Sequence, residues 1–141
     1  MLTNFLLDPY HGALAATAVI SGSVLLASLA RRATGEVNPT EATLLINRED
    51  ALMIDVRETN EYASGFIAGS RNIPLARLAE RLGELDGDKN RKVVVACAGG
   101  SRSAQAVKTL TQAGFTDVRN LAGGISAWQQ AGLPLSRKGK K

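Results

Sequence analysis

The residues in this sequence with the clearest chemical potential lie together in one short stretch, CAGGSRS at positions 97–103. The stretch contains the only cysteine of the chain, two adjacent glycines, and Arg102 between two serines. A cysteine is a strong nucleophile only as its thiolate, and helix N-termini and nearby cations favour that form. The stretch therefore predicts an activated thiol, Cys97, at the start of a glycine loop.

The loop itself predicts a site for an anion next to the sulfur. Gly99 and Gly100 permit backbone dihedrals closed to other residues, so that successive amide groups can point inward. A helix that begins near Ser101 would add the positive end of its dipole, and Arg102 a permanent charge if its side chain turns toward the loop. Such a thiolate is a nucleophile with a built-in site for an anionic substrate. The simpler alternative is that Cys97 is an inert buried thiol at the end of a strand.

The elements that position the loop are predicted to be strands that alternate with helices. Short apolar runs predict strands at 51–56, 70–75, 92–97 and 117–121, and helices are expected at 38–47, 58–65, 76–85, 101–114 and 124–132. In the helix 101–114, Ala104, Val107 and Leu110 are expected on one face. The pattern predicts an α/β fold with a central parallel sheet of about five strands and helices on both faces. Cys97 ends the strand 92–97, and ligands bind beyond the carboxyl ends of such strands.

An N-terminal apolar segment predicts a membrane anchor over residues 1–32. Ala13 to Ala30 are eighteen residues without a charge, and as a helix they span about 27 Å, close to the hydrocarbon core of a bilayer. Arg31 and Arg32 follow this segment and predict a single-pass protein with its C-terminal domain in the cytoplasm. A cleaved signal peptide or a buried helix are the alternatives, although a signal peptide would need cations before the apolar run.

The charge of the chain is concentrated at its ends. The sequence has 141 residues and a net charge of +4, but residues 41–134 carry eleven cations and eleven anions. A nucleic-acid surface needs its cations on the folded domain, so nucleic acid is not an expected partner. Two basic segments on either side of a neutral domain are more typical of attraction to anionic lipid head groups. The expected organisation is the anchor, a linker at 33–37, a domain at 38–134 and a basic tail at 135–141. The only histidine, His11, is expected at the membrane interface.

Three segments in order resemble the rhodanese-like domains, a family of sulfurtransferases: LMIDVRETNEYASGFIAGSRNIPL, VVVACAGGSRSAQAVKTLTQAGF and VRNLAGGISAW. The resemblance covers about Val37 to Pro134, and the anchor, double arginine and LPLSR tail are similar to bacterial membrane-anchored members. It implies that Cys97 takes up a sulfane sulfur as a persulfide. It also implies a loop that binds the donor, made of Ala98, Gly99, Gly100, Ser101, Arg102 and Ser103.

The same resemblance gives Asp55 and Arg57 a supporting role at the site and implies no metal or organic cofactor. From the sequence alone, Asp55 and Arg57 are equally consistent with a structural ion pair to Glu58 or Glu61. Phe66 stands where many family members have a histidine, and little effect is expected from this change. Gly123, Gly124 and Trp128 are expected to serve turns and packing.

The function implied by this resemblance is sulfur transfer in two steps. A small anionic donor, such as thiosulfate, a polysulfide or a persulfide, would load Cys97, and cyanide, a thiol or a protein acceptor would unload it. Ala98 and Ser101 are small and uncharged where many family loops are basic, which leaves the preferred donor open. Phosphatase or arsenate reductase chemistry is a rival, but those loops place the arginine six residues after the cysteine, not five. The other alternative is a docking or persulfide-carrier module at the membrane.

Overall fold

The computed structural model describes residues 19–27, 29–30 and 35–139, and the chain divides into two units at Thr34 and Gly35. In the first unit, residues 19–27 and 29–30 are helical, and their apolar side chains are exposed, with Val19 and Leu26 at 71% and 70%. None of the helices in the described ranges is both long and apolar enough to cross a membrane. Much of the predicted anchor, including residues 13–18 and His11, lies outside the described residues.

The second unit is built on a sheet of five parallel strands, which agrees with the predicted parallel sheet of about five, although only four strands were located in the sequence. The strands are β1 (Glu36–Val37), β2 (Leu52–Asp55), β3 (Arg71–Asn72), β4 (Lys92–Ala96) and β5 (Asp117–Leu121). Their order across the sheet is β1-β5-β4-β2-β3, with every pair parallel. All residues of β2 and Val93 to Ala96 of β4 are buried, because both strands are central in the sheet and covered on both faces.

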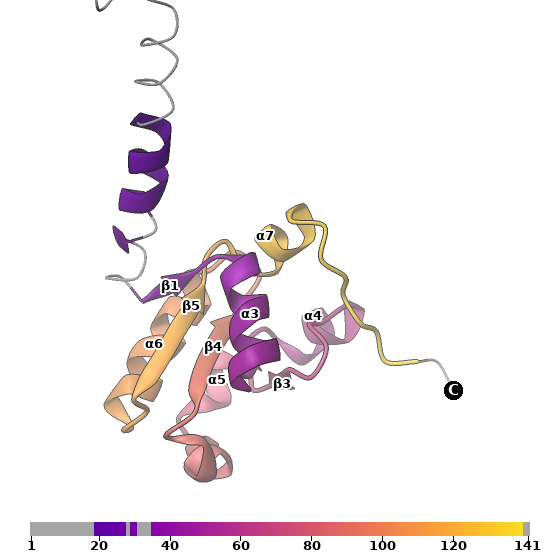
Figure 1. Ribbon diagram of the computed structural model, residues 1–141. Helices are drawn as coiled ribbons and strands as arrows, with labels where there is room; N and C mark the ends of the chain where they lie inside the picture. Colours follow the sequence, from indigo (N-terminus) through magenta and orange to yellow (C-terminus); the bar gives the residue numbers. More distant parts are fainter. Residues whose placement is uncertain (1–18, 28, 31–34, 140–141) are drawn as a thin grey trace, which may run out of the picture. The chain divides into compact units, whose positions relative to one another are not determined.

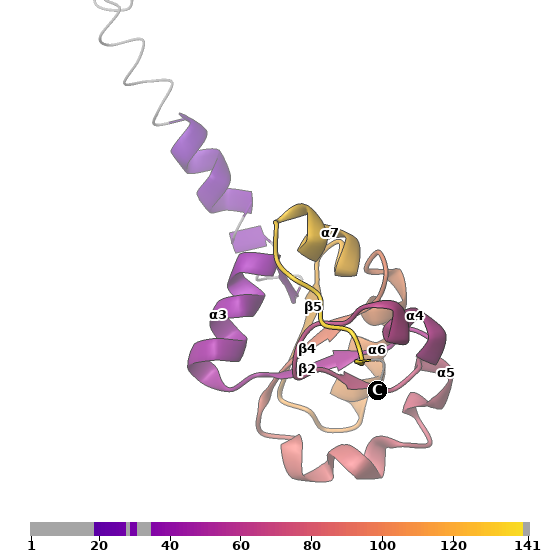
Figure 2. The ribbon, with the colours of Figure 1, turned by 90° about the vertical axis from the view of Figure 1, so that its right-hand side faces the viewer.

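The helices cover the two faces of this sheet (Figures 1 and 2). They are α3 (Pro39–Glu49), α4 (Thr59–Ser64), α5 (Leu75–Leu78), the 3-10 helix η1 (Leu82–Asp88), α6 (Ser101–Gln112) and α7 (Gly124–Gln130). One core cluster joins the sheet to α5, η1 and α6, and the other joins it to α3 and α7. The predicted helix start at Asn38 is a full capping box with Glu41.

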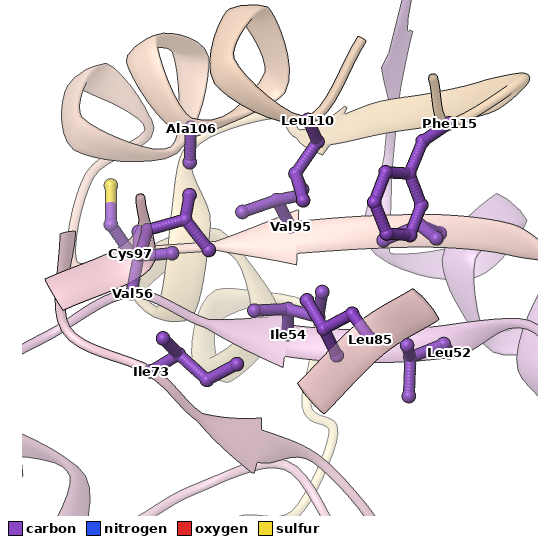
Figure 3. Close-up of a cluster of buried hydrophobic side chains, with 12 residues drawn as sticks. Leu52, Ile54, Val56, Ile73, Leu85, Val95, Cys97, Ala106, Leu110 and Phe115 are labelled. Carbon is purple, nitrogen blue, oxygen red and sulfur yellow. The ribbon is translucent and has the colours of Figure 1, made fainter. Parts of the chain in front are cut away.

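Figure 3 shows the first of these clusters, in which Cys97 lies beside Val56 at one end of the row of apolar side chains. Residues along β2 and β4 alternate between the two clusters: Ile54 and Val95 belong to this one, and Met53 and Val94 to the other. This alternation follows from the period of two in a strand. The cysteine side chain therefore starts from a strand that is fixed by packing on both sides.

Two local predictions were wrong. The helix expected at 76–85 is replaced by the short α5 and by η1, which contains Gly83 and Gly87. Each glycine disfavours an α-helix by about 1 kcal/mol relative to alanine. Leu78 of α5 and Leu85 of η1 still pack in the core. In α6 the buried face contains Ser103, Ala106 and Leu110, whereas Ala104 is exposed.

The domain extends further than 38–134 at both ends. Glu36 and Val37, expected in the linker, form β1 and pair with Asn120 and Leu121. Ser136, expected in the basic tail, exchanges two backbone hydrogen bonds with Phe66, at 2.9 and 2.7 Å. The edge strand β1 and the segment at Ser136 are thus tied to the body of the domain.

Candidate active site

Cys97 immediately follows β4 and opens a short loop that ends at the N-terminus of α6. Its side chain is buried, with 1% of the residue exposed, while Ala98, Gly99 and Ser101 of the loop are exposed. Gly100 is the N-cap of α6 and has a φ of 106°, in the left-handed region that favours glycine. Gly99 does not have a positive φ and a Cβ there would meet nothing within 4 Å. Only one of the two glycines is therefore required by the backbone.

The sulfur of Cys97 receives two hydrogen bonds from the far side of this loop. The amide of Gly100 lies 3.0 Å from Sγ, and the hydroxyl of Ser103 lies 3.3 Å from it. Ser103 is itself fully buried in the first turn of α6. Hydrogen bonds to a charged acceptor are stronger than those to a neutral one, so these donors favour the thiolate.

The net result is that the pKa of the Cys97 thiol lies below its ordinary value. Burial raises this pKa, because a charge is costly away from water. The hydroxyl and amide of Ser103 and the amides of Gly100 and Gly99 oppose that effect and lower the pKa. The cysteine is thus held in an apolar surrounding by groups that select its reactive form.

The Ser103 hydroxyl is placed by Asn120, a residue of β5. The Asn120 Oδ1 atom lies 2.5 Å from the hydroxyl oxygen, and its Nδ2 atom donates to the Gly100 carbonyl at 3.1 Å. Since the hydroxyl has one proton, the Asn120 amide oxygen, the Gly100 carbonyl at 3.1 Å and the sulfur compete for it, and a thiolate is the strongest acceptor of the three. Asn120 therefore ties the loop and the hydroxyl to the sheet.

Helix α7 supports the loop through the two carbonyls that follow the strand. The amide of Ile125 donates to the Cys97 carbonyl at 2.8 Å, and that of Ser126 to the Ala98 carbonyl at 3.2 Å. A Cβ on Gly124 would lie 2.3 Å from the Cys97 carbonyl oxygen. Gly124 therefore does more than form the expected turn. It lets the backbone of α7 approach and hydrogen-bond to the start of the loop.

Arg102, the cation of the loop, forms an ion pair with Glu61 of α4. Its Nη1 and Nη2 atoms lie 2.8 and 2.9 Å from the two carboxylate oxygens. Both side chains are half-buried. The guanidinium is thus engaged in a two-point contact with a residue 41 positions earlier in the sequence.

Asp55 and Arg57 form a buried ion pair with each other, and not with the Glu58 or Glu61 side chains that the alternative interpretation named. The Arg57 Nη2 atom lies 2.8 Å from Asp55 Oδ2. Arg57 also donates to the backbone carbonyls of Glu61 at 3.3 Å and Gly65 at 2.7 Å. Within the described residues neither side chain hydrogen-bonds to the loop, so the pair acts on the site by holding α4.

Two residues of the site were not found from the sequence, Asn120 and Glu61. Asn120 follows Arg119 in a strand of mixed polarity, DVRNL, so the sequence gives no sign that its side chain is buried. Glu61 follows the DVR motif at helical spacing but gives no sign of its distant partner. Of the residues expected to serve packing, Trp128 is buried and donates to the Pro134 carbonyl at 3.0 Å, and Phe66 stacks on Tyr62.

Comparison with known proteins agrees with this architecture. Residues 38–131 match the family model described as Rhodanese-like domain. An uncharacterized protein of Escherichia coli, YibN, is 40% identical over 69% of this chain and 68% of its own length. A sulfurtransferase of Allochromatium vinosum is 41% identical over 64% of this chain and 83% of its own length.

A solved structure of the same kind is the rhodanese-related protein of Thermoplasma volcanium. It is 38% identical and has a TM-score of 0.64, over 73% of this chain and 98% of that chain. The fold and the cysteine loop thus define an α/β domain of the sulfurtransferase type. The chain belongs to the rhodanese-like domain family.

Proposed function

We propose that this protein is a sulfurtransferase in which Cys97 carries the transferred sulfur as a persulfide. The observation that carries the proposal is the geometry at Sγ, where the Gly100 amide and the Ser103 hydroxyl approach within 3.0 and 3.3 Å. These donors stabilise a thiolate before the reaction. The named relative in Allochromatium vinosum is a sulfurtransferase, which supports the same reaction class here.

In the first step the Cys97 thiolate attacks the outer sulfur of the donor. A bond forms between Sγ and that sulfur, the sulfur–sulfur bond of the donor breaks, and the leaving group departs with the electron pair. In the second step an acceptor thiolate or cyanide attacks the outer sulfur of the persulfide, and Cys97 leaves as a thiolate. The hydrogen bonds that lower the pKa of Cys97 also make it a better leaving group.

Phosphatase chemistry is less well supported, because it needs an arginine that is available to a phosphoryl group. In this site Arg102 donates through both terminal nitrogens to Glu61. The loop is also one residue shorter between cysteine and arginine than the phosphatase pattern requires. A shorter loop encloses a single sulfur atom more readily than a tetrahedral phosphoryl group.

The test is turnover with cyanide as the acceptor. The full chain should form thiocyanate from thiosulfate or glutathione persulfide, and Cys97→Ser should lose this activity completely. Activity that survives in Cys97→Ser would overturn the assignment. A Cys97 persulfide that forms but does not turn over with cyanide or with thiols would instead support a persulfide-carrier module.

We also propose that the N-terminal segment anchors the domain to a membrane, with the domain on the cytoplasmic side. Support comes from the eighteen uncharged residues between Ala13 and Ala30 and from the arginines at 31 and 32. The exposed apolar side chains of the helix 19–27 are consistent with a lipid or protein surrounding.

A further inference from the structure

The loop around Cys97 has a single charged side chain, Arg102, and its positive charge is balanced by a carboxylate from another element. Both of its terminal nitrogens donate to the Glu61 carboxylate, in a fork-to-fork arrangement at 2.8 and 2.9 Å. Such bidentate pairs are the strongest and most specific of arginine contacts. The carboxylate of Glu61 thus engages both of the terminal nitrogens with which Arg102 could otherwise bind an anion.

Glu61 is held in this position by the elements around it. One of its oxygens also accepts from the Glu58 amide at 2.9 Å, and its backbone carbonyl accepts from the buried Arg57 at 3.3 Å. The hydrogen bond from Arg102, together with that amide, lowers the pKa of Glu61 to about 2. The carboxylate is therefore ionised at any physiological pH, and the pair is a fixed feature of the site.

The second ion pair near the site does not supply a free cation either. Arg57 is paired with Asp55, and both are buried. The groups that hydrogen-bond to the Cys97 sulfur are therefore an amide and a hydroxyl, and the charges of Arg102 and Arg57 are each balanced by a carboxylate. This environment suits a donor with little charge beside the reacting sulfur.

The candidate donors differ in this respect. Thiosulfate carries two negative charges, and the sulfonate that must leave is bonded directly to the transferred sulfur. An organic persulfide has a thiol sulfur and a carbon there, and any carboxylates lie several bonds away. The Glu61 charge repels the sulfonate and keeps Arg102 from binding it, whereas it has little effect on the persulfide.

We propose that Glu61 is a specificity-determining residue, which removes the loop's cation from the donor and so directs this site toward organic persulfides and away from thiosulfate. This inference rests on the proposed sulfurtransferase function. The favoured reaction forms the bond between Cys97 Sγ and the outer sulfur of the persulfide and breaks its sulfur–sulfur bond. The electron pair and the proton leave with the donor thiol, so no outside oxidant or reductant is needed.

The test compares the two donors in Glu61→Gln. Glutamine is a good replacement, because it can keep the hydrogen bond that closes the N-terminus of α4, while it removes the negative charge. We expect kcat/KM for thiosulfate to rise roughly five-fold, since a dianion gains a free arginine and loses a repulsive charge at a half-exposed site. The kcat/KM for glutathione persulfide should change less than about two-fold, because its charged groups lie away from the reacting sulfur and interactions between exposed charges are weak.

Two further variants separate charge from structure. Glu84→Gln removes the same charge from another arginine pair, since among the described residues the Glu84 side chain hydrogen-bonds only to Arg81, and it should leave the donor ratio unchanged. Glu61→Asp keeps the charge and should stay close to the wild-type ratio. The thiosulfate rate of Glu61→Gln should also fall more steeply with added salt than that of the wild type.

The outcomes are distinct. A wild-type preference for persulfide that moves toward thiosulfate only in Glu61→Gln supports the inference. An unchanged donor ratio in Glu61→Gln, or equal effects of the Gln and Asp variants, would overturn it while the sulfurtransferase function stands. If neither donor forms a persulfide on wild-type Cys97, the proposed function fails, and this inference fails with it.

Discussion

At the scale of single residues, the reactivity of Cys97 depends on a balance between burial and hydrogen bonding. The thiol is 1% exposed, which by itself would favour its neutral form. The amides of the loop and the Ser103 hydroxyl reverse this preference. The result is a cysteine that is both shielded and activated, as a persulfide intermediate requires.

Ser103→Ala tests this balance. Loss of the hydroxyl removes one donor to the thiolate, so the pKa of Cys97 should rise and its reaction should need a higher pH. At pH 7 we expect the rate of alkylation by iodoacetamide to fall roughly ten-fold, the value of one hydrogen bond to a charged group. The measurement is the rate of modification of Cys97 as a function of pH.

The matched control for this variant is Thr111→Ala, which removes a hydroxyl from the other end of the same helix. Among the residues that the structure describes, this hydroxyl bonds only to the Val107 carbonyl. Its pH profile should match that of the wild type. A Ser103→Ala profile that also matches the wild type would show that the hydroxyl serves packing and not activation.

At the scale of residues, the sequence predicted those parts of the site whose interacting residues are close together in the chain. Cys97, Gly100 and Ser103 lie within seven residues, and the geometry of a strand, a loop and a helix start follows from their types. Arg102 and its partner Glu61 lie 41 residues apart. No local pattern shows which carboxylate Arg102 meets, because that depends on where α4 packs.

At the scale of elements, the loop is held between α6, which supplies the donors, and α7, which binds the first two loop carbonyls. The contact to α7 is close enough that only glycine fits at position 124, where φ is 59° and a Cβ would lie 2.3 Å from the Cys97 carbonyl oxygen. The GG-x-x-x-W segment thus positions the active-site loop as well as closing the fold.

Gly124→Ala should therefore move the loop and destabilise the domain. The added methyl group clashes with backbone and occupies a left-handed conformation, so we expect a loss of roughly 2–4 kcal/mol in the free energy of unfolding. Urea unfolding measures this loss. Gly87→Ala, where a Cβ meets nothing within 4 Å and φ is not positive, is the control and should stay within 1 kcal/mol or so of the wild type. Equal stabilities of the two variants would contradict the assigned role of Gly124.

The strands were predicted more reliably than the helices at this scale. The strand expected at 92–97 has three consecutive valines and only apolar residues after Lys92, and such a short run bounded by turn residues is typical of a buried strand. The helix expected at 76–85 failed because its leucine spacing suggests a helix, while Gly83 within it and Gly87 just after it weaken one. Strand β1 was missed because two residues carry no periodicity, and its existence depends on pairing with β5.

At the scale of the whole molecule, the charge distribution and the uncharged N-terminal segment are the basis for the proposed membrane location. The second unit begins at Gly35 and has its own two-sided core. A chain that begins at Gly35 should therefore fold without the N-terminal segment. Sulfur transfer to a soluble acceptor should not depend on the first 34 residues.

Flotation with lipid vesicles tests the membrane proposal. The full chain, reconstituted with vesicles that contain phosphatidylglycerol, should float with them and should resist extraction by high salt, because a spanning helix is held by burial and not by charge. The chain that begins at Gly35 should remain in the soluble fraction. Release of the full chain by salt would indicate a peripheral contact through the basic residues and would contradict a spanning anchor.

The most direct test of the central claim is the intact mass of the full chain after incubation with glutathione persulfide, and separately with thiosulfate. Sulfur carriage on Cys97 predicts a gain in mass of one sulfur atom, which is lost on addition of an excess of acceptor thiol and is absent in Cys97→Ser. No gain with either donor, or the same gain in Cys97→Ser, would contradict the assignment of Cys97 as the sulfur carrier.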